Sequence, residues 1–286
     1  LNPDSAKGVL TMSSNTIGAH NGLHSADGAL AGEHPGRSRN PLIKVADVAW
    51  LEFDKPDLTR TEAFAHAFGF ATVLRTDSEL QLRGADPGSP CVIVHRGGTS
   101  RLRALAFAAE RSDVLCLADA AGTHVRPLPE SLGGIGTDLI DPSGLQVRVV
   151  ADTHRLDALP IQTAHTVNVG HGTARINATQ RPPRAPATIQ RLGHVVVQST
   201  KYRAALDWYL DHLGLIVSDF LHFPGQHDRG PTMSFIRCDR GATPTDHHTL
   251  AMALGPANRY VHSAFQVCDL DALAAGGEYL KDAGYQ

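Results

Sequence analysis

The feature that most constrains the fold of this chain is a repeat within it. A run of apolar residues at helical spacing ends at Gly69, and a similar run ends at Gly214, 145 residues later (214 − 69 = 145). Glycine is favoured directly after a helix because it adopts the left-handed backbone that closes the last turn. Strand-like runs precede and follow each helix. The chain therefore predicts two copies of a strand–helix–strands unit.

The predicted elements place the chain in the α+β class. Paired βαβββ modules are expected to form two curled-sheet domains, and the concave face of such a sheet can hold a small ligand. Helices are predicted at Leu58–Phe68, near Leu102–Glu110, at 202–213 and at Leu270–Ala283. Strand-like runs are Val45–Phe53, Glu79–Arg83, Cys91–His95, Val114–Ala118, Leu145–Val150, Leu192–Gln198, Thr232–Cys238, Thr249–Leu254 and Tyr260–Val267.

Composition divides the 286 residues into four parts. Residues 1–40 are rich in Gly, Ser, Ala, Asn and His without periodicity, which predicts a flexible N-terminal arm. A first domain is expected over 41–160. Segment 161–187 contains several glycines and prolines and few large apolar residues, so we interpret it as a linker. The second domain is then 188–286.

Charge and cysteine usage exclude several classes of partner. Lys and Arg number 26 against 29 for Asp and Glu, so no basic surplus indicates nucleic acid or an anionic membrane. No apolar stretch approaches the roughly 20 residues that cross a bilayer. The four cysteines are scattered and form no CxxC pair, which argues against a thiolate zinc site. Reduced cysteines predict a cytoplasmic protein.

Three of the sixteen histidines lie in or beside apolar strands of the second half. His194 lies within Leu-Gly-His-Val-Val-Val, His262 within Val-His-Ser-Ala-Phe-Gln-Val, and His248 within His-His-Thr-Leu-Ala-Met. A buried ring nitrogen without a partner costs about 1–3 kcal/mol, and most such histidines simply find a neighbour in the core. Two at equivalent places in consecutive modules favour shared metal binding. Imidazole suits iron, zinc, copper and nickel, so residue type does not choose the metal.

These three motifs, in this order, resemble the type I extradiol ring-cleaving dioxygenases of the vicinal oxygen chelate (glyoxalase/bleomycin resistance/dioxygenase) superfamily, such as the 2,3-dihydroxybiphenyl dioxygenases. The resemblance covers roughly residues 41–286. It implies that His194 and His262 bind Fe²⁺, with Mn²⁺ as an alternative, and that His248 acts as the catalytic acid and base beside the metal. His247 is the alternative for that role, but the separation of 14 residues from His262 favours His248 (262 − 248 = 14).

The resemblance also implies what the protein does and with what. The substrates would be a small aromatic diol of the catechol type and O₂, both of whose atoms enter the product as the ring opens. Such enzymes serve the breakdown of aromatic compounds and work as homo-oligomers. The substituents of the diol, proximal or distal cleavage, and the residues that contact substrate stay open.

The family's third iron ligand is a glutamate in a strand that follows an Asp-Pro-x-Gly turn. The front half contains such a turn at Asp141–Gly144, with Arg148 where the ligand would fall and Ala49 aligned with His194. We therefore expect a front domain without metal. In the rear half the glutamate and its turn are expected beyond Gln286.

Two other functions fit the same modules. One is a glyoxalase-like, metal-dependent isomerase or lyase, which would not need His248 beside the metal. The other is a protein that binds a small ligand without turnover. Fold resemblance alone does not separate these from a dioxygenase.

Overall fold

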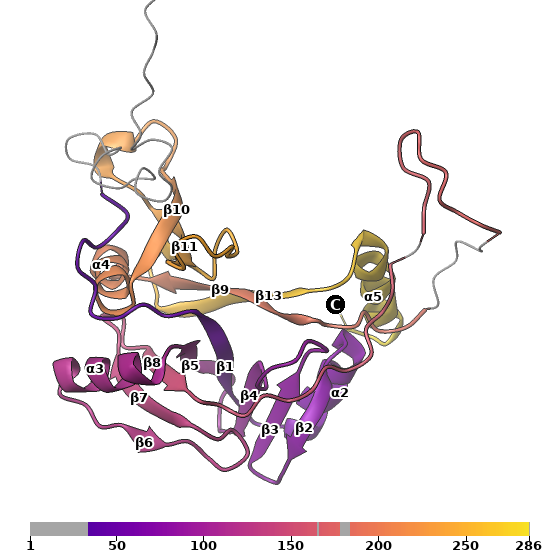
Figure 1. Cartoon of the computed structure of the whole chain (residues 1–286), viewed down its shortest axis with the longest axis horizontal. Helices are drawn as coiled ribbons and strands as arrows, with labels where there is room; N and C mark the ends of the chain where they lie inside the picture. Colours follow the sequence, from indigo (N-terminus) through magenta and orange to yellow (C-terminus); the bar gives the residue numbers. More distant parts are fainter. Residues whose placement is uncertain (1–33, 165, 178–183, 286) are drawn as a thin grey trace, which may run out of the picture.

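The computed structural model describes residues 34–164, 166–177 and 184–285. They form two sheets, one from each half of the chain, and the rear sheet lies across the front domain (Figure 1). The front sheet has eight strands in the order β2-β3-β4-β1-β5-β8-β7-β6, and the rear sheet has five in the order β10-β11-β12-β9-β13. The α+β class and the two curled-sheet domains are confirmed.

The front domain contains two complete βαβββ modules. The first is β1 (Asp47–Lys55), α2 (Leu58–Phe68), β2 (Ala71–Arg75), β3 (Glu79–Arg83) and β4 (Val92–Arg96). The second is β5 (Arg101–Ala108), α3 (Arg111–Ala121), β6 (Arg126–Pro127), β7 (Ile135–Ile140) and β8 (Gln146–Ala151).

The rear domain repeats this order. Its first module is β9 (Arg191–Ser199), α4 (Tyr202–Leu213), β10 (Leu215–Leu221), β11 (Met233–Cys238) and β12 (Leu250–Leu254). A short 3₁₀ turn at His227–Arg229 separates β10 from β11. The next module begins with β13 (Arg259–Gln266) and α5 (Leu270–Asp282).

The two glycines that revealed the repeat close α2 and α4 as predicted. Gly69 has φ = +113° and Gly214 has φ = +64°, and the N–H of each bonds a carbonyl of the last helical turn. Gly69 is also fixed by space, because a Cβ there would lie 1.6 Å from the carbonyl oxygen of Ala187. The start of α2 is equally defined: the Asp57 side chain accepts from the N–H of Arg60. Local sequence therefore sets both ends of this helix.

Two predicted elements are wrong in type. The segment expected to be helical near Leu102–Glu110 is strand β5, and the strand-like run Val114–Ala118 lies in helix α3. β5 is rich in alanine and leucine, which favour helices, but it lies between β1 and β8, and that pairing overrides the propensity. In α3 the buried residues are Val114, Leu117 and Ala118, a helical spacing that a five-residue window hides.

The predicted flexible arm differs from the structure in its last residues. Residues 1–33 lie outside the described part of the chain. Residues 34–40 lie against the rear domain, where the ring Nε2 of the buried His34 is 2.6 Å from Asp207 Oδ1. The Gly36 carbonyl accepts from the Val217 N–H at 2.8 Å. The second contact satisfies a backbone N–H at the edge of β10, which composition could not reveal.

One hydrophobic core joins the two domains, because the helix-covered faces of both sheets pack together. Phe107 of β5 meets Tyr209 of α4 with ring centroids 6.4 Å apart. The Tyr209 hydroxyl, fully buried, donates to Asp141 Oδ2 at 3.1 Å. Asp141 in turn accepts from the N–H groups of Ser143 and Leu145, so the front turn is tied to the rear helix. None of the described helices is long and apolar enough to span a membrane.

Candidate metal centre

Two of the three selected histidines lie on neighbouring strands of the rear sheet. His194 is on β9 and His262 on β13. In the antiparallel register His194 is opposite Ala264, and His262 is opposite Val196. Residues two apart on a strand share a face, so both imidazoles point to the face away from the front domain. Their ring centroids are 5.6 Å apart.

The third histidine reaches the same place from the loop before β12. The ring centroid of His248 is 4.1 Å from that of His194 and 5.1 Å from that of Phe235. The Nδ1 of His247 lies 3.2 Å from His248 Nδ1, and its Nε2 lies 2.7 Å from Asp219 Oδ2. The structure therefore brings His194, His248 and His262 together, and His247 contacts this group through His248.

Burial and nearby rings lower the pKa of two of these imidazoles, His194 and His248. Burial lowers the pKa of His194 to about 4, and the nearby rings of His248 and His262 add to the effect. Burial also lowers the pKa of His248, and the nearby ring of His247 lowers it further. A neutral imidazole has a free lone pair on one nitrogen, which a metal ion requires. At neutral pH His194 is therefore ready to bind a cation.

The negative charge of Asp246 partly offsets the lowering of the pKa of His194 and of His248, but this carboxylate is already paired with an arginine. Arg191 donates to its two oxygens at 2.8 and 2.9 Å. Within the described ranges, no group of three or more His, Cys, Asp or Glu is arranged to hold a metal ion. The donor chemistry of His194 and His262 fits a divalent transition metal, as two imidazoles of a larger ligand set.

The front domain has different residues at the corresponding positions. His194 is the fourth residue of β9, and the fourth residue of β1 is Trp50, not the Ala49 that helix alignment indicated. The register agrees, since Trp50 is opposite Ala106, the sixth residue of β5, and His194 is opposite Ala264, the sixth of β13. A wholly buried indole therefore fills the front position.

Beside Trp50 lies a buried network of charges. Its centre is Glu52, 2% exposed, which accepts from Trp50 Nε1 at 3.0 Å and pairs with Arg148. Arg148 also donates to Asp138 at 2.7 Å, and His95 Nε2 lies 3.4 Å from Glu52. Burial acts to raise the pKa of Glu52, but the bonds from His95 and Trp50 and the charge of Arg148 outweigh it and lower that pKa. His95, on β4, thus belongs to this network.

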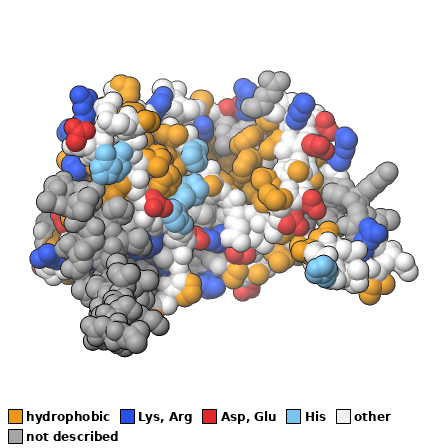
Figure 2. Space-filling model, turned by 90° about the horizontal axis from the view of Figure 1, so that it is seen from above, with side chains coloured by type: hydrophobic (Ala, Val, Ile, Leu, Met, Phe, Trp, Pro, Cys, Tyr) orange, Lys and Arg blue, Asp and Glu red, His pale blue; other side chains and the backbone are white. Residues whose placement is uncertain are grey.

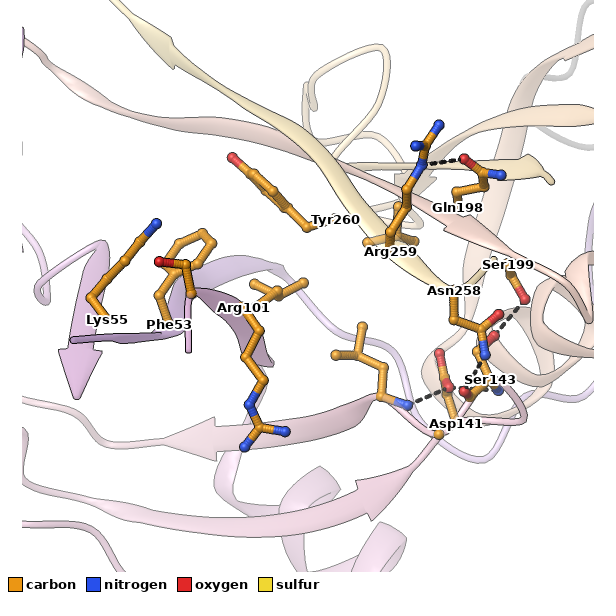
Figure 3. A pocket seen from close by; sticks show the side chains of 15 residues that line it. Phe53, Lys55, Arg101, Asp141, Ser143, Gln198, Ser199, Asn258, Arg259 and Tyr260 are labelled. Carbon is orange, nitrogen blue, oxygen red and sulfur yellow. Dashed lines mark hydrogen bonds between the residues drawn. The ribbon is translucent and has the colours of Figure 1, made fainter. Parts of the chain in front are cut away.

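The three histidines lie on the open face of the rear sheet, the face away from the front domain. The cavity between the two domains is a separate feature. Viewed onto that open face, histidine side chains gather on one side of the molecule beside hydrophobic ones (Figure 2). A cavity of about 480 Å³ lies on the opposite face of β9, between the domains, lined by Val197, Tyr260 and Phe53 (Figure 3). Its floor is the joint where Asn258 Nδ2 donates to the carbonyl oxygen of Ser143 at 2.7 Å.

Comparison with known proteins agrees with this architecture. Residues 191–286 match the family described as the Glyoxalase/Bleomycin resistance protein/Dioxygenase superfamily. The chain is 28% identical over 269 residues to Metapyrocatechase 2 of Cupriavidus necator, an alignment that covers 92% of this chain and 77% of that protein. The rear half of the chain is thus similar to this superfamily, in agreement with its motifs.

Solved structures give the same fold. The Mn(II)-bound glyoxalase from Novosphingobium aromaticivorans superposes with a TM-score of 0.67 at 23% identity, over 85% of this chain and 72% of that one. Homoprotocatechuate 2,3-dioxygenase from Arthrobacter globiformis gives a TM-score of 0.67 at 15% identity, over 86% and 71%. At these identities the likeness speaks for the fold alone.

Proposed function

We propose that this protein is an extradiol dioxygenase, which inserts both atoms of O₂ into a catechol-type diol and opens its ring. The observation that carries the proposal is the position of His248, whose ring lies over His194 on the open face of the rear sheet. The 28% identity to Metapyrocatechase 2 across most of the chain supports the same reaction class.

His194 and His262 would hold the metal ion, for which we propose Fe²⁺, with Mn²⁺ as the alternative. The third ligand we propose is a glutamate on a strand that pairs with β13 opposite Ala264. In the front domain, Arg148 of β8 occupies that position, opposite Ala106 of β5. β13 is an edge strand within the described residues, whereas β5 is paired on both sides. When bound, the ion would hold the diol and O₂ together and transfer electron density between them.

The chain's own residues would then transfer protons and exclude water from the site. A neutral His248 can accept the proton of a substrate hydroxyl at a free ring nitrogen and return it to a product oxygen. Phe235, in edge contact with His248, would give one wall of the site an apolar surface. Apolar walls exclude water and so strengthen the polar contacts inside.

Compartment and assembly follow as lesser proposals. All four cysteines are free, which fits the reducing cytoplasm. Leu270 and Leu273 of α5 are 79% and 58% exposed and offer apolar surface for a homo-oligomer.

A glyoxalase-like isomerase or lyase is the second candidate, because the match of residues 191–286 to the superfamily does not separate it from a dioxygenase. The two differ in their need for His248. Full-length protein loaded with ferrous iron should turn a panel of catechols yellow under air. His248→Ala should keep its iron yet lose about 10²–10⁴-fold in ring-opening rate. A parent-level rate in His248→Ala, or an iron-loaded parent inert toward every catechol, would contradict the dioxygenase assignment.

A further inference from the structure

Three side chains form a hydrogen-bonded row that ends at the metal centre. Asp219 is on β10, and His247 and His248 precede β12. The row runs from Asp219 Oδ2 to His247 Nε2, 2.7 Å, and from His247 Nδ1 to His248 Nδ1, 3.2 Å. His248 is the last member and the only one that contacts His194 by its ring.

The direction of the hydrogen bonds follows from the chemistry of each group. An ionised carboxylate only accepts, so the Nε2 of His247 must carry a hydrogen. The Nδ1 of a neutral His247 then has a lone pair and must accept. The hydrogen between the two rings therefore belongs to Nδ1 of His248, which leaves the lone pair of His248 on Nε2.

The backbone that carries this row is anchored on two strands. The Ser218 hydroxyl donates to the His247 carbonyl at 2.5 Å and itself accepts from Arg237 at 2.9 Å. On the other side, the two hydrogen bonds that Arg191 donates to Asp246 tie the loop to β9. The orientation of His248 is thus set from both β9 and β10.

We propose that Asp219 and His247 are positioning residues that hold His248 in the Nδ1–H tautomer, with Nε2 free to exchange a proton with substrate. This inference rests on the proposed function. In the step it serves, the O–H bond of a substrate hydroxyl breaks and an N–H bond forms at Nε2. The cation that results shares its Nδ1–H with His247 and, through that ring, faces the charge of Asp219. The proton later returns to a product oxygen, so no other reactant is required.

The decisive variant is Asp219→Asn, which keeps the size of the side chain. Its amide N–H can donate to His247 Nε2, which moves the hydrogens of the row so that His248 carries its hydrogen on Nε2. Two-bond ¹H–¹⁵N spectra of metal-free protein labelled with ¹⁵N-histidine report this tautomer directly. We expect the Nδ1–H form of His248 in the parent and the Nε2–H form in Asp219→Asn.

Kinetics of the iron-loaded proteins separate positioning from a general structural effect. Asp219→Asn should lower kcat by about 10-fold, part of what a general acid–base group contributes, with iron content and catechol Kd within twofold of the parent. Asp219→Glu should recover most of the rate. The matched control Asp228→Asn, at an exposed position of the same domain, should change neither spectrum nor rate.

The inference is overturned if an active parent and Asp219→Asn share the same His248 tautomer and the same kcat. It is equally overturned if the rate falls only together with iron content. A parent that opens no catechol ring would refute the proposed function instead, and the spectra would still decide whether Asp219 sets the tautomer.

Discussion

Replacing Arg148 by methionine tests whether the ion pairs of this residue stabilise the fold of the front domain. Arg148 pairs with the buried Glu52 and with Asp138, at the position where the rear domain is expected to place a metal ligand. Methionine fills similar space without charge, so Arg148→Met leaves Glu52 as a buried anion. Removing one member of a buried ion pair costs about 3–5 kcal/mol.

The structure sets the expected value at the lower end of that range. Glu52 keeps a bond from Trp50 at 3.0 Å and a contact with His95 at 3.4 Å, which stabilise part of its charge. Asp138 keeps its ion pair with the more exposed Arg126, so its lost bond to Arg148 adds little to the loss of stability. We therefore expect a loss of about 3 kcal/mol, or roughly 150-fold in the unfolding constant. In the double variant Glu52→Gln/Arg148→Met the loss should be smaller, because no buried charge remains.

The assay is urea unfolding at neutral pH followed by tryptophan fluorescence, since Trp50 lies inside this network. The control is Arg184→Met: Arg184 is 74% exposed and pairs with the exposed Asp282, so its loss should cost at most about 1 kcal/mol. An Arg148→Met protein within 1 kcal/mol of the parent would refute the reasoning. So would a double variant less stable than Arg148→Met.

Two further predictions follow from particular positions. Because the pKa of Glu52 is lowered in the folded protein, its ionised form stabilises the fold above the unfolded value of about 4.5 and loses that effect as pH falls through the folded pKa. The stability difference between the parent and Glu52→Gln should therefore narrow in acid, and a constant difference from pH 7 to pH 3 would contradict this. Gly69→Ala should lower the melting temperature more than Gly122→Ala: both glycines have positive φ, but only at Gly69 would the new Cβ collide with backbone. Equal melting temperatures would show that the contact with Ala187 is not constraining.

The repeat and the boundaries of α2 could be predicted because local chemistry determines them. Asp57 and Gly69 mark the ends of α2, and each effect lies within one turn. The types of β5 and α3 could not be predicted in this way. β5 is alanine-rich and becomes a strand only because β1 and β8 pair with it, and that pairing joins residues some fifty or forty positions apart.

The candidate site shows the same division. The motifs identified His194, His248 and His262, and the structure brings the three rings together. Sequence alone did not find Asp219, because a polar residue at the end of a strand carries no local mark of the histidine it meets 28 residues later. It also aligned Ala49 with His194, since the helix offset of 145 differs by one from the strand register. One residue changes the face of a strand, so only the paired strands identify Trp50.

We propose one metal site per chain, made by the rear domain. The test is to measure the iron bound to the full-length protein after anaerobic loading with Fe²⁺ and removal of excess. We expect one ion per chain in the parent and almost none in the double variant His194→Ala/His262→Ala, with His248→Ala remaining loaded. Two ions per chain in the parent, or occupancy unchanged in the double variant, would contradict it.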